Sequence, residues 1–410
     1  MNLTETTSPD SEQTNNRKES LWELLLIFTR LGLTSFGGPV AHLGYFRQEF
    51  VVRRKWLSEQ SYADLVAMCQ FLPGPASSQV GIAVGVLRHG YLGALLAWTG
   101  FTLPSAVFLI LVALGISAYG AEIPTGLLHG LKVVAVAVVA QAVWGMYRSL
   151  CRGWIRSLMM ILAASMATLY TGAFSQLGII VIAGIVGALV FKPMAKPSHE
   201  YLPVAISRQS GYFWLSLFFV LLIALPILAS LLPYQGLSDF SSFFRVGSLV
   251  FGGGHVVLPL LQAEVVPQGL VSNDAFLAGY GAAQAVPGPL FTFAAFLGAS
   301  MNQAPTGVSG GLLCLVAIFA PSFLLVMGAI PFWEALRRNR SMQAVLSGVN
   351  AAVVGLLLAA FFNPVWTSAI HTPGDLIVAV FAFVALVYWK APPWLIVVAC
   401  GAVGAILPML

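Results

Sequence analysis

The sequence predicts an all-α polytopic membrane protein made of two inverted repeats, and three observations lead to this prediction. The 410 residues are 58% hydrophobic and only 9% charged, whereas charged residues make up about a quarter of a soluble globular chain. Apolar runs of about 20 residues, the length of a membrane-spanning helix, recur along the chain. Segments rich in Gly and Pro also occur twice. This composition excludes a soluble globule, and the net charge of +5 is too small to indicate nucleic-acid binding.

The duplication is visible in four pairs of matching segments. They are 28–39 with 244–254, 70–75 with 284–289, 103–105 with 320–322, and 184–188 with 401–405. The offset stays between 214 and 217 residues, which indicates a duplicated unit of about 200 residues. In an apolar chain, repeats that are interrupted by Gly and Pro at matching places are typical of a transporter whose site lies between its halves.

The chain begins with a polar segment, and predicted membrane spans follow. We expect residues 1–20 to form a disordered cytoplasmic tail. This tail is not a signal peptide, because the apolar run behind it contains Glu23 and Arg30 and no small-residue cleavage site. Nine apolar runs predict spans at 91–118, 127–147, 157–173, 175–191, 212–232, 307–332, 342–362, 374–389 and 393–409.

Four further stretches are long enough to cross a membrane, but a cluster of Gly or Pro interrupts each of them. These stretches are 21–50, 61–88, 239–264 and 274–300. Proline removes a backbone donor and glycine admits dihedral angles that other residues resist, so a helix breaks at such a cluster. Within a membrane, the freed amides are tolerated only inside protein or beside water.

The basic residues predict that the broken stretches of the first half are re-entrant hairpins. Basic residues lie at 53–55 after the first stretch and at 88 after the second, and others follow at 148–156 and 192–208. The positive-inside rule places all four groups in the cytoplasm. This holds only if each broken stretch returns to the side from which it entered. The first membrane repeat, 21–192, is therefore two hairpins followed by four spans.

The second half is predicted to have the opposite orientation. Within the linker 193–238, the lone span 212–232 carries the chain outward. The loop from Glu264 to Asp274 contains no Lys or Arg, as is typical of an external loop, whereas the basic residues at 337–340 and 390 fall inside again. The second membrane repeat, 239–410, is therefore inverted relative to the first.

Arg30 and Arg245 are the first candidates for a binding site. Ionisable residues within membrane segments are functional candidates because burying a charge there costs about 2.5–3.5 kcal/mol. These arginines are repeat partners, and a guanidinium group offers a fork of donors that suits an oxyanion. The alternatives are a side chain that reaches the membrane interface, or, for Arg30, an ion pair with Glu23.

The four breaks supply the second group of candidates. A new helix begins after each break, and its free amides and positive dipole end favour an anion. The alternative is a tight turn where hairpins pack, which would itself create the free donors. The candidates at the breaks are Ser35, Gly37, Gly38, Pro73, Gly74, Pro75, Ser77, Ser78, Gly252, Gly253, Gly254, His255, Pro287, Gly288, Pro289 and Thr292.

Three more ionisable residues complete the set. Lys132 lies in an apolar span, where it meets either an anion or a carboxylate. Glu49 and Glu264 occupy matching positions after the first hairpin of each half, as possible proton carriers or as interfacial anchors. No GxxxxGK or HExxH motif and no CxxC spacing occurs. We therefore expect no catalytic residue, metal or cofactor, and transport driven by gradients.

The chain resembles the chromate ion transporter family, in its long form with two homologous halves. The resemblance rests on residues 28–39 and 70–75 of the first half, with 251–254 and 285–289 of the second, and covers about 22–410. It implies export of chromate from the bacterial cytoplasm across the inner membrane, chromate resistance, sulfate as a competing mimic, and no cofactor. A homodimer is a possible assembly.

Physical chemistry is consistent with export, but alternatives stay open. A dianion that leaves a negative interior gains about 4.6 kcal/mol per 100 mV, whereas uptake would need coupled protons or sodium ions. A sulfate or other oxyanion transporter of the same fold is the first alternative, because both ions are tetrahedral dianions of similar size. An anion channel is the second, because inverted repeats with re-entrant hairpins also occur in channels.

Overall fold

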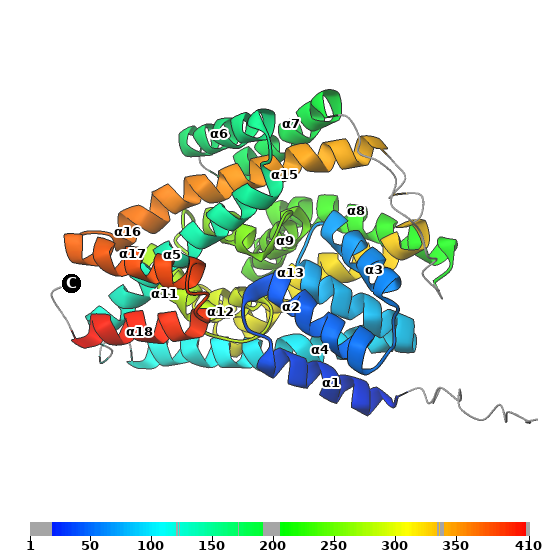
Figure 1. Cartoon of the computed structure of the whole chain (residues 1–410), viewed down its shortest axis with the longest axis horizontal. Helices are drawn as coiled ribbons and strands as arrows, with labels where there is room; N and C mark the ends of the chain where they lie inside the picture. The colour runs from blue at the N-terminus through cyan, green and yellow to red at the C-terminus, as the bar shows by residue number, and fades with distance from the viewer. Residues whose placement is uncertain are drawn as a thin grey trace, which may run out of the picture.

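A computed structural model of the chain describes residues 19–119, 122, 124–170, 172–191, 206–333, 336 and 340–406. Every regular element among these residues is helical, so the predicted all-α class is confirmed (Figure 1). Most of the predicted tail 1–20 and residues 192–205 of the predicted linker lie outside the described residues.

The first half contains eight helical segments before the connecting helix. They are α1 (Leu21–Thr34), α2 (Gly38–Arg47), the π-helical η1 (Gln48–Arg53), α3 (Glu59–Phe71), α4 (Ala76–Tyr119), α5 (Thr125–Leu150), α6 (Trp154–Leu169) and α7 (Ala173–Val190). The connecting helix is α8 (Arg208–Leu231). Ser20 and Glu23 form a capping box that starts α1, because each side chain satisfies a backbone amide of the first turn.

The second half contains thirteen helical segments among the described residues. They are α9 (Gln235–Leu249), η2 (Gly254–Val256), α10 (Val257–Val265), α11 (Asn273–Gln284), η3 (Leu290–Thr292), α12 (Phe293–Ala299), α13 (Gly307–Ala329), η4 (Ile330–Phe332), α15 (Arg340–Ala360), η5 (Phe361–Trp366), α16 (Thr367–Ala369), α17 (Pro373–Val387) and α18 (Pro393–Ile406). All four predicted breaks are interruptions between helices.

The kink in α4 separates the second broken stretch from the first full span. The backbone leaves the helical region at His89 and Gly90, and Gly90 has φ +60°. Gly307, at the matching place in the second half, also has φ +60° and begins α13 after a loop. Only glycine adopts such angles without strain. The predicted start of a span at residue 91 therefore coincides with the break between the two helical parts of α4.

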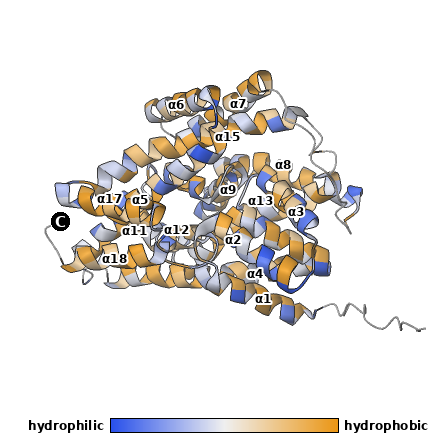
Figure 2. Cartoon of the chain, in the orientation of Figure 1, coloured by the Kyte–Doolittle hydropathy of each residue, from blue (hydrophilic) through white to orange (hydrophobic). Residues whose placement is uncertain are grey.

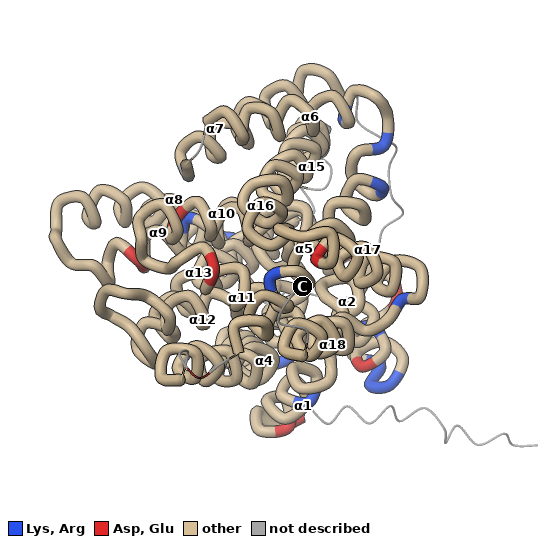
Figure 3. Tube along the Cα trace, turned by 90° about the vertical axis from the view of Figure 1, so that its left-hand side faces the viewer, with Lys and Arg blue, Asp and Glu red and all other residues tan. Residues whose placement is uncertain are grey.

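Five helices among the described residues are long and apolar enough to cross a membrane. These are Ala76–Tyr119, Thr125–Leu150, Arg208–Leu231, Gly307–Phe332 and Ser341–Ala369. The other four predicted spans form shorter apolar helices, α6, α7, α17 and α18. Apolar residues cover most of these helices (Figure 2) and charged residues are sparse (Figure 3). The chain is thus a multi-pass membrane protein.

The two ends of each broken stretch in the first half lie together. Glu19, just before α1, accepts a 2.7 Å hydrogen bond from the Trp56 indole and pairs with Arg88 at the end of the first part of α4. The guanidinium groups of Arg54 and Arg88 lie 5.3 and 4.8 Å from the centre of the Trp56 ring. The segments before, between and after the two broken stretches therefore meet around Trp56.

The last helix of each half packs against the other half. The α18 helix of the second half packs against α5 of the first, and α7 of the first half packs against α15 of the second. A Cβ added at Gly130 of α5 would overlap the carbonyl oxygen of Cys400, and one added at Gly348 of α15 would overlap that of Ala183. These two contacts join matching positions of the repeats in reciprocal fashion. Glycine allows such close backbone approach between membrane helices, so the halves interlock.

Candidate anion-binding site at the helix breaks

The four breaks are joined in pairs across the two halves. The amide of Gly74, in the second break of the first half, donates a 2.7 Å hydrogen bond to the carbonyl of Val250, in the first break of the second half. In the same way, the amide of Gly288 donates a 2.9 Å hydrogen bond to the carbonyl of Ser35. These are matching positions of the two repeats. In each pair, one break therefore supplies the hydrogen-bond partner for a backbone group of the other break.

Glycine is required at the donor position of each pair. Gly74 has φ +122° and Gly288 has φ +101°. A Cβ at Gly74 would lie 2.7 Å from Ser322 Oγ, and a Cβ at Gly288 would lie 2.9 Å from Ser105 Oγ. Both the backbone conformation and the space exclude a side chain. The serines come from the repeated Pro-Ser segment of the opposite half, so the reciprocal arrangement extends to α4 and α13.

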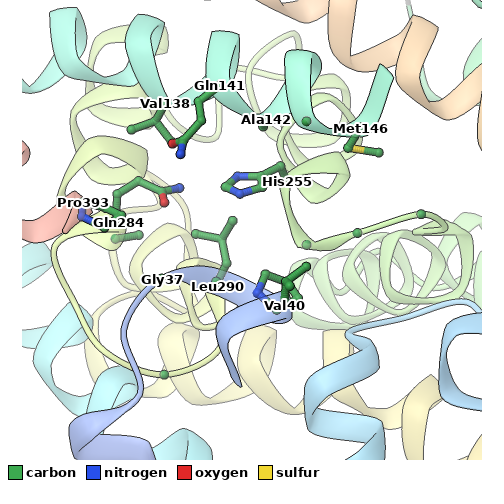
Figure 4. Close-up of a pocket in the computed structure, with 18 of the residues that line it drawn as sticks. Gly37, Val40, Val138, Gln141, Ala142, Met146, His255, Gln284, Leu290 and Pro393 are labelled. Carbon is green, nitrogen blue, oxygen red and sulfur yellow. The ribbon is translucent and has the colours of Figure 1, made fainter. Parts of the chain in front are cut away.

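A cavity of about 430 Å³ lies where three of the four breaks meet. The first turn of α2 and the continuous η2–α10 helix start at its wall, together with the start of η3. The α5 helix forms the facing wall (Figure 4), and Pro393 of α18 also contributes to the lining. The remaining break, Pro73-Gly74-Pro75, is not among the described residues that line the cavity.

Seven of the candidate residues line the cavity. They are Gly37, Gly38, Gly252, Gly253, Gly254, His255 and Gly288. The candidates that do not line it are Arg30, Ser35, Pro73, Gly74, Pro75, Ser77, Ser78, Lys132, Arg245, Pro287, Pro289 and Thr292, with Glu49 and Glu264. Among these, Ser77 lies 3.4 Å from His42 Nδ1, and the Thr292 hydroxyl donates to the Pro289 carbonyl at 2.8 Å.

Arg245 and Glu264 form a buried ion pair. Arg245 donates to both carboxylate oxygens at 2.7 Å, and the side chains are 15% and 3% exposed. The guanidinium group also lies 5.3 Å from the centre of the Phe174 ring. The two candidates therefore satisfy each other in this conformation.

The matching pair in the first half is arranged differently. Glu49 pairs with Arg53 at 3.0 Å and Arg54 at 2.6 Å, near the end of η1. Arg30 is exposed on the surface of α1 and makes no ion pair with any residue that the structure describes. The repeated arginines thus differ in environment, and only Arg30 has a free guanidinium group.

Lys132 meets a carboxylate, which was one of its two expected partners. Its ammonium group lies 3.0 Å from Asp274 at the start of α11. One turn earlier on α5, His129 Nε2 lies 2.6 Å from the buried Asp375 at the start of α17. The ion pair of Lys132 and the hydrogen bond of His129 therefore hold the first turns of α5 against the helices around it.

Polar residues that the sequence reasoning did not select also line the cavity. Gln141 and Ser149 come from α5, and Gln284 comes from the end of α11. Gln284 belongs to the repeated QxxPGP segment, and Gln141 is a lone polar residue in an apolar run, so both left a signal in the sequence. Their side chains point toward His255 (Figure 4).

The cavity has mostly apolar walls, and none of its described lining residues is charged. Its polar side chains are two carboxamides, a hydroxyl and an imidazole, and the first residues of α2, η2 and η3 also line it. The start of α2 brings the positive end of a helix dipole to the wall. Such a wall suits an anion and can hold it by hydrogen bonds alone.

The family described as "Chromate transporter" matches residues 22–188 and again 237–405, so the two copies found in the sequence correspond to two family units. No solved structure matches the chain.

Three similar proteins carry related descriptions. The "Probable chromate transport protein" of Synechococcus elongatus is 28% identical, over 83% of this chain and 84% of its own. The "Chromate transport protein" of Pseudomonas aeruginosa is 28% identical, over 86% and 82%. That of Cupriavidus metallidurans is 25% identical, over 94% and 93%. With both halves matched by the family, the chain belongs to the chromate transporter family.

Proposed function

We propose that the protein is a secondary transporter that exports chromate from the cytoplasm across the inner membrane and confers chromate resistance, with sulfate as a competing mimic. The observation that carries the proposal is the cavity at the meeting of the breaks. Its lining includes the starts of α2 and of η2–α10 and the side chains of Gln141 and Gln284, which are groups that can donate hydrogen bonds to an anion. A tetrahedral oxyanion is the ligand that this arrangement suits.

The location of the cavity supports entry from the cytoplasm. Its wall includes Ser149 near the end of α5 and Pro393 at the start of α18. Arg148 and Lys390, which we assign to cytoplasmic loops, lie next to these residues. The opposite end of α5 is held by the Lys132–Asp274 and His129–Asp375 pairs. We therefore propose that this conformation faces the cytoplasm, with the N-terminus on the same side and the second repeat inverted.

The candidate residues have separate roles in this proposal. Gly37, Gly38, Gly252, Gly253, Gly254 and His255 border the anion, while Gly74, Gly288 and the prolines beside them shape the breaks. Arg30 attracts the anion from outside the cavity. Arg245 and Glu264 hold α9 against α10, and release of this pair during transport would free Glu264 for a proton.

Chromate uptake into inside-out vesicles tests the proposal. Uptake that saturates and is inhibited by excess sulfate is the expected result, because both ions present four acceptor oxygens in a tetrahedron. An imposed gradient that drives no chromate accumulation would contradict export. Sulfate accumulation without chromate accumulation would favour the sulfate transporter, and high unitary conductance would favour a channel.

A further inference from the structure

The helices form two bodies, and each body contains helices of both halves. In the bundle body, made of α5–α7, α15–α18 and η5, α15 packs against α5, α6 and α7, and α5 packs against α17 and α18. In the hairpin body, made of α1–α4, α8–α13 and η1–η4, α4 packs against α1, α12 and α13, and α13 packs against α8, α9 and α12. In Figure 1, α6, α7 and α15 lie together at the top, away from α1, α2 and α4. The boundary between the bodies therefore differs from the boundary between the repeats.

Close backbone contacts join the helices within each body. In the hairpin body, a Cβ added at Gly247 of α9 would overlap the carbonyl oxygen of Ile318 on α13. In the bundle body, Gly130 of α5 and Gly348 of α15 make equally close contacts with α18 and α7. Helices packed this closely leave no space for one backbone to slide past the other. Each body is thus built to move as a unit.

Among the residues that the structure describes, the extended contacts between the two bodies come from helices of the second half. The α11 helix packs against α5 and α18, and α10 packs against α7 and α15. Asp274 on α11 pairs with Lys132 on α5 at 3.0 Å, and the Asn273 carboxamide donates a 2.6 Å hydrogen bond to Ser368 on α16. The matching helices of the first half, α2 and α3, pack against α4, and no comparable contact joins them to the bundle body.

Matching faces of α11 and α3 differ in burial. Leu277 and Gly281 of α11 are buried, and a Cβ added at Gly281 would overlap the carbonyl oxygen of Leu131 on α5. Ala63 and Ala67 occupy the matching positions of α3, 214 residues earlier, and both are exposed. These alanines are small and apolar, as a close helix contact requires. The face of α3 that corresponds to the buried face of α11 is therefore uncovered in this conformation.

The cavity lies between the two bodies. The breaks of the hairpin body form one side of it, and α5 with Pro393 of the bundle body forms the other (Figure 4). Resting on the proposed function, we infer that transport rocks the hairpin body against the bundle body, with the contact of α11 and α5 as the outer gate. In the opposite conformation, α11 leaves α5 and α3 closes on α15, because inverted repeats can exchange their local arrangements around a fixed site.

Movement of one whole repeat against the other is the alternative. It would separate α5 from α18 and α7 from α15, which are the contacts that Gly130 and Gly348 make at the level of the backbone. Movement of the bodies leaves those contacts intact and breaks only the contacts of η2, α10 and α11. Rigid bodies that meet at a small interface are the usual moving parts of such a transition.

A disulfide between α3 and α15 tests this inference in full-length protein reconstituted into liposomes. The Cβ added at Gly281 would lie 3.4 Å from Leu131 Cβ, close to the separation of about 3.5–4.5 Å in a disulfide. The matching pair of the inner side is Ala67→Cys with Val349→Cys. These thiols should meet in the opposite conformation, so an added oxidant should join them and stop chromate uptake, and reduction should restore it. A variant that transports chromate but forms no disulfide overturns the inference.

The matched control is Ala67→Cys with Ala359→Cys. Ala359 follows Val349 by ten residues on α15, which is about 15 Å at 1.5 Å per residue. These two thiols should stay reduced under the same treatment. A disulfide in the control as well would show that the bridge does not report a specific closure, and it would overturn the inference.

A second pair replaces the first if the α3–α15 variant does not fold. Asn273→Cys with Ser368→Cys places thiols at two positions that are in contact in this conformation. A short bifunctional thiol reagent should bridge them, hold the outer gate closed and stop uptake. Uptake that continues through a complete bridge overturns the inference.

A bridge inside the bundle body distinguishes the two kinds of movement. A Cβ added at Gly184 of α7 would lie 3.3 Å from Val345 Cγ1 on α15, so Gly184→Cys with Val345→Cys joins the two halves without joining the two bodies. Uptake should continue after oxidation at the rate of the reduced variant. Loss of uptake on oxidation that reduction restores would show that the halves move against each other, and it would overturn the inference.

The bridges also separate this inference from the proposed function, because formation of the disulfide requires the movement and not chromate. A disulfide between positions 67 and 349 in a protein that moves no chromate would contradict the proposed function and support the inference. Chromate uptake that continues with this disulfide complete would do the reverse.

Discussion

Arg245 donates to both carboxylate oxygens of Glu264 at 2.7 Å, and this pair joins α9 to α10 across the first break of the second half. The carboxylate is 3% exposed. Attraction between the two charges offsets their desolvation, so neither group is tolerated there without the other. The pair therefore contributes to the fold besides any role in transport.

Glu264→Gln should lower the stability of the protein strongly. Removing one partner of a buried pair costs about 3–5 kcal/mol, measurable as a drop in the melting temperature of the purified protein. The control is Glu59→Gln, whose ion pair with Arg47 has side chains 58% and 51% exposed; exposed pairs contribute at most about 1 kcal/mol. Equal shifts in the two variants would show that the Arg245 pair is not structural.

Gly74→Ala should prevent correct joining of the two halves. The added Cβ would lie 2.7 Å from both Gln79 Nε2 and Ser322 Oγ, at a backbone φ of +122°. Strain and overpacking together cost about 3 kcal/mol. A smaller amount of folded protein should therefore elute as a single peak in size-exclusion chromatography. Gly178→Ala is the control, because no atom lies within 4 Å of its added Cβ. A normal yield of Gly74→Ala would argue against the pairing of the breaks.

The sequence was sufficient to predict the breaks because Gly and Pro act locally. The segments around Gly74 and Gly288 interrupt helices whatever surrounds them, and the helices of the structure end and begin there. The hydrogen bonds from these glycines to Val250 and Ser35 were not part of that prediction.

Side-chain partners could not be predicted, because they depend on packing between distant segments. Repetition suggested that Arg30 and Arg245 are equivalent, but Glu264 reaches Arg245 while Glu49 turns to Arg53 and Arg54. The side chains around the cavity also differ between the two halves. Gln141 corresponds to Ala359 in the second half, so the repeated breaks alone do not reveal this side chain.

Arg30→Gln should weaken the attraction of substrate and leave stability unchanged. The side chain is exposed and makes no ion pair in the described part of the chain, so its loss removes only a long-range field. We expect KM for chromate to rise by about threefold to tenfold at low salt, with a smaller difference at high salt. Arg208→Gln removes an exposed arginine at the start of α8 as the control. A KM equal to that of the control would remove Arg30 from the transport path.

The contacts of Glu19 predict a component of stability that depends on pH. Burial alone would raise its pKa, but hydrogen bonds from backbone, Arg88 and Trp56 outweigh burial and lower it from the ordinary value of 4.5. A lowered folded pKa gives stability that is present above about pH 4.5 and lost as the pH falls through the folded value. The stability difference between wild type and Glu19→Gln should therefore shrink on acidification. A difference that is constant with pH would contradict this account.

Cysteine labelling should show that the two halves enter the membrane from opposite sides. The four native cysteines are all buried, so added cysteines dominate the reaction with an impermeant reagent. Glu59→Cys lies between the hairpins of the first half and Gln268→Cys lies between those of the second, and both positions are exposed. In right-side-out vesicles, only the cysteine at 268 should react, and in inside-out vesicles only the one at 59. Reaction of both from one side would contradict the inverted arrangement. Labelling is informative here because the reciprocal contacts between the halves do not determine which side of the membrane each hairpin enters.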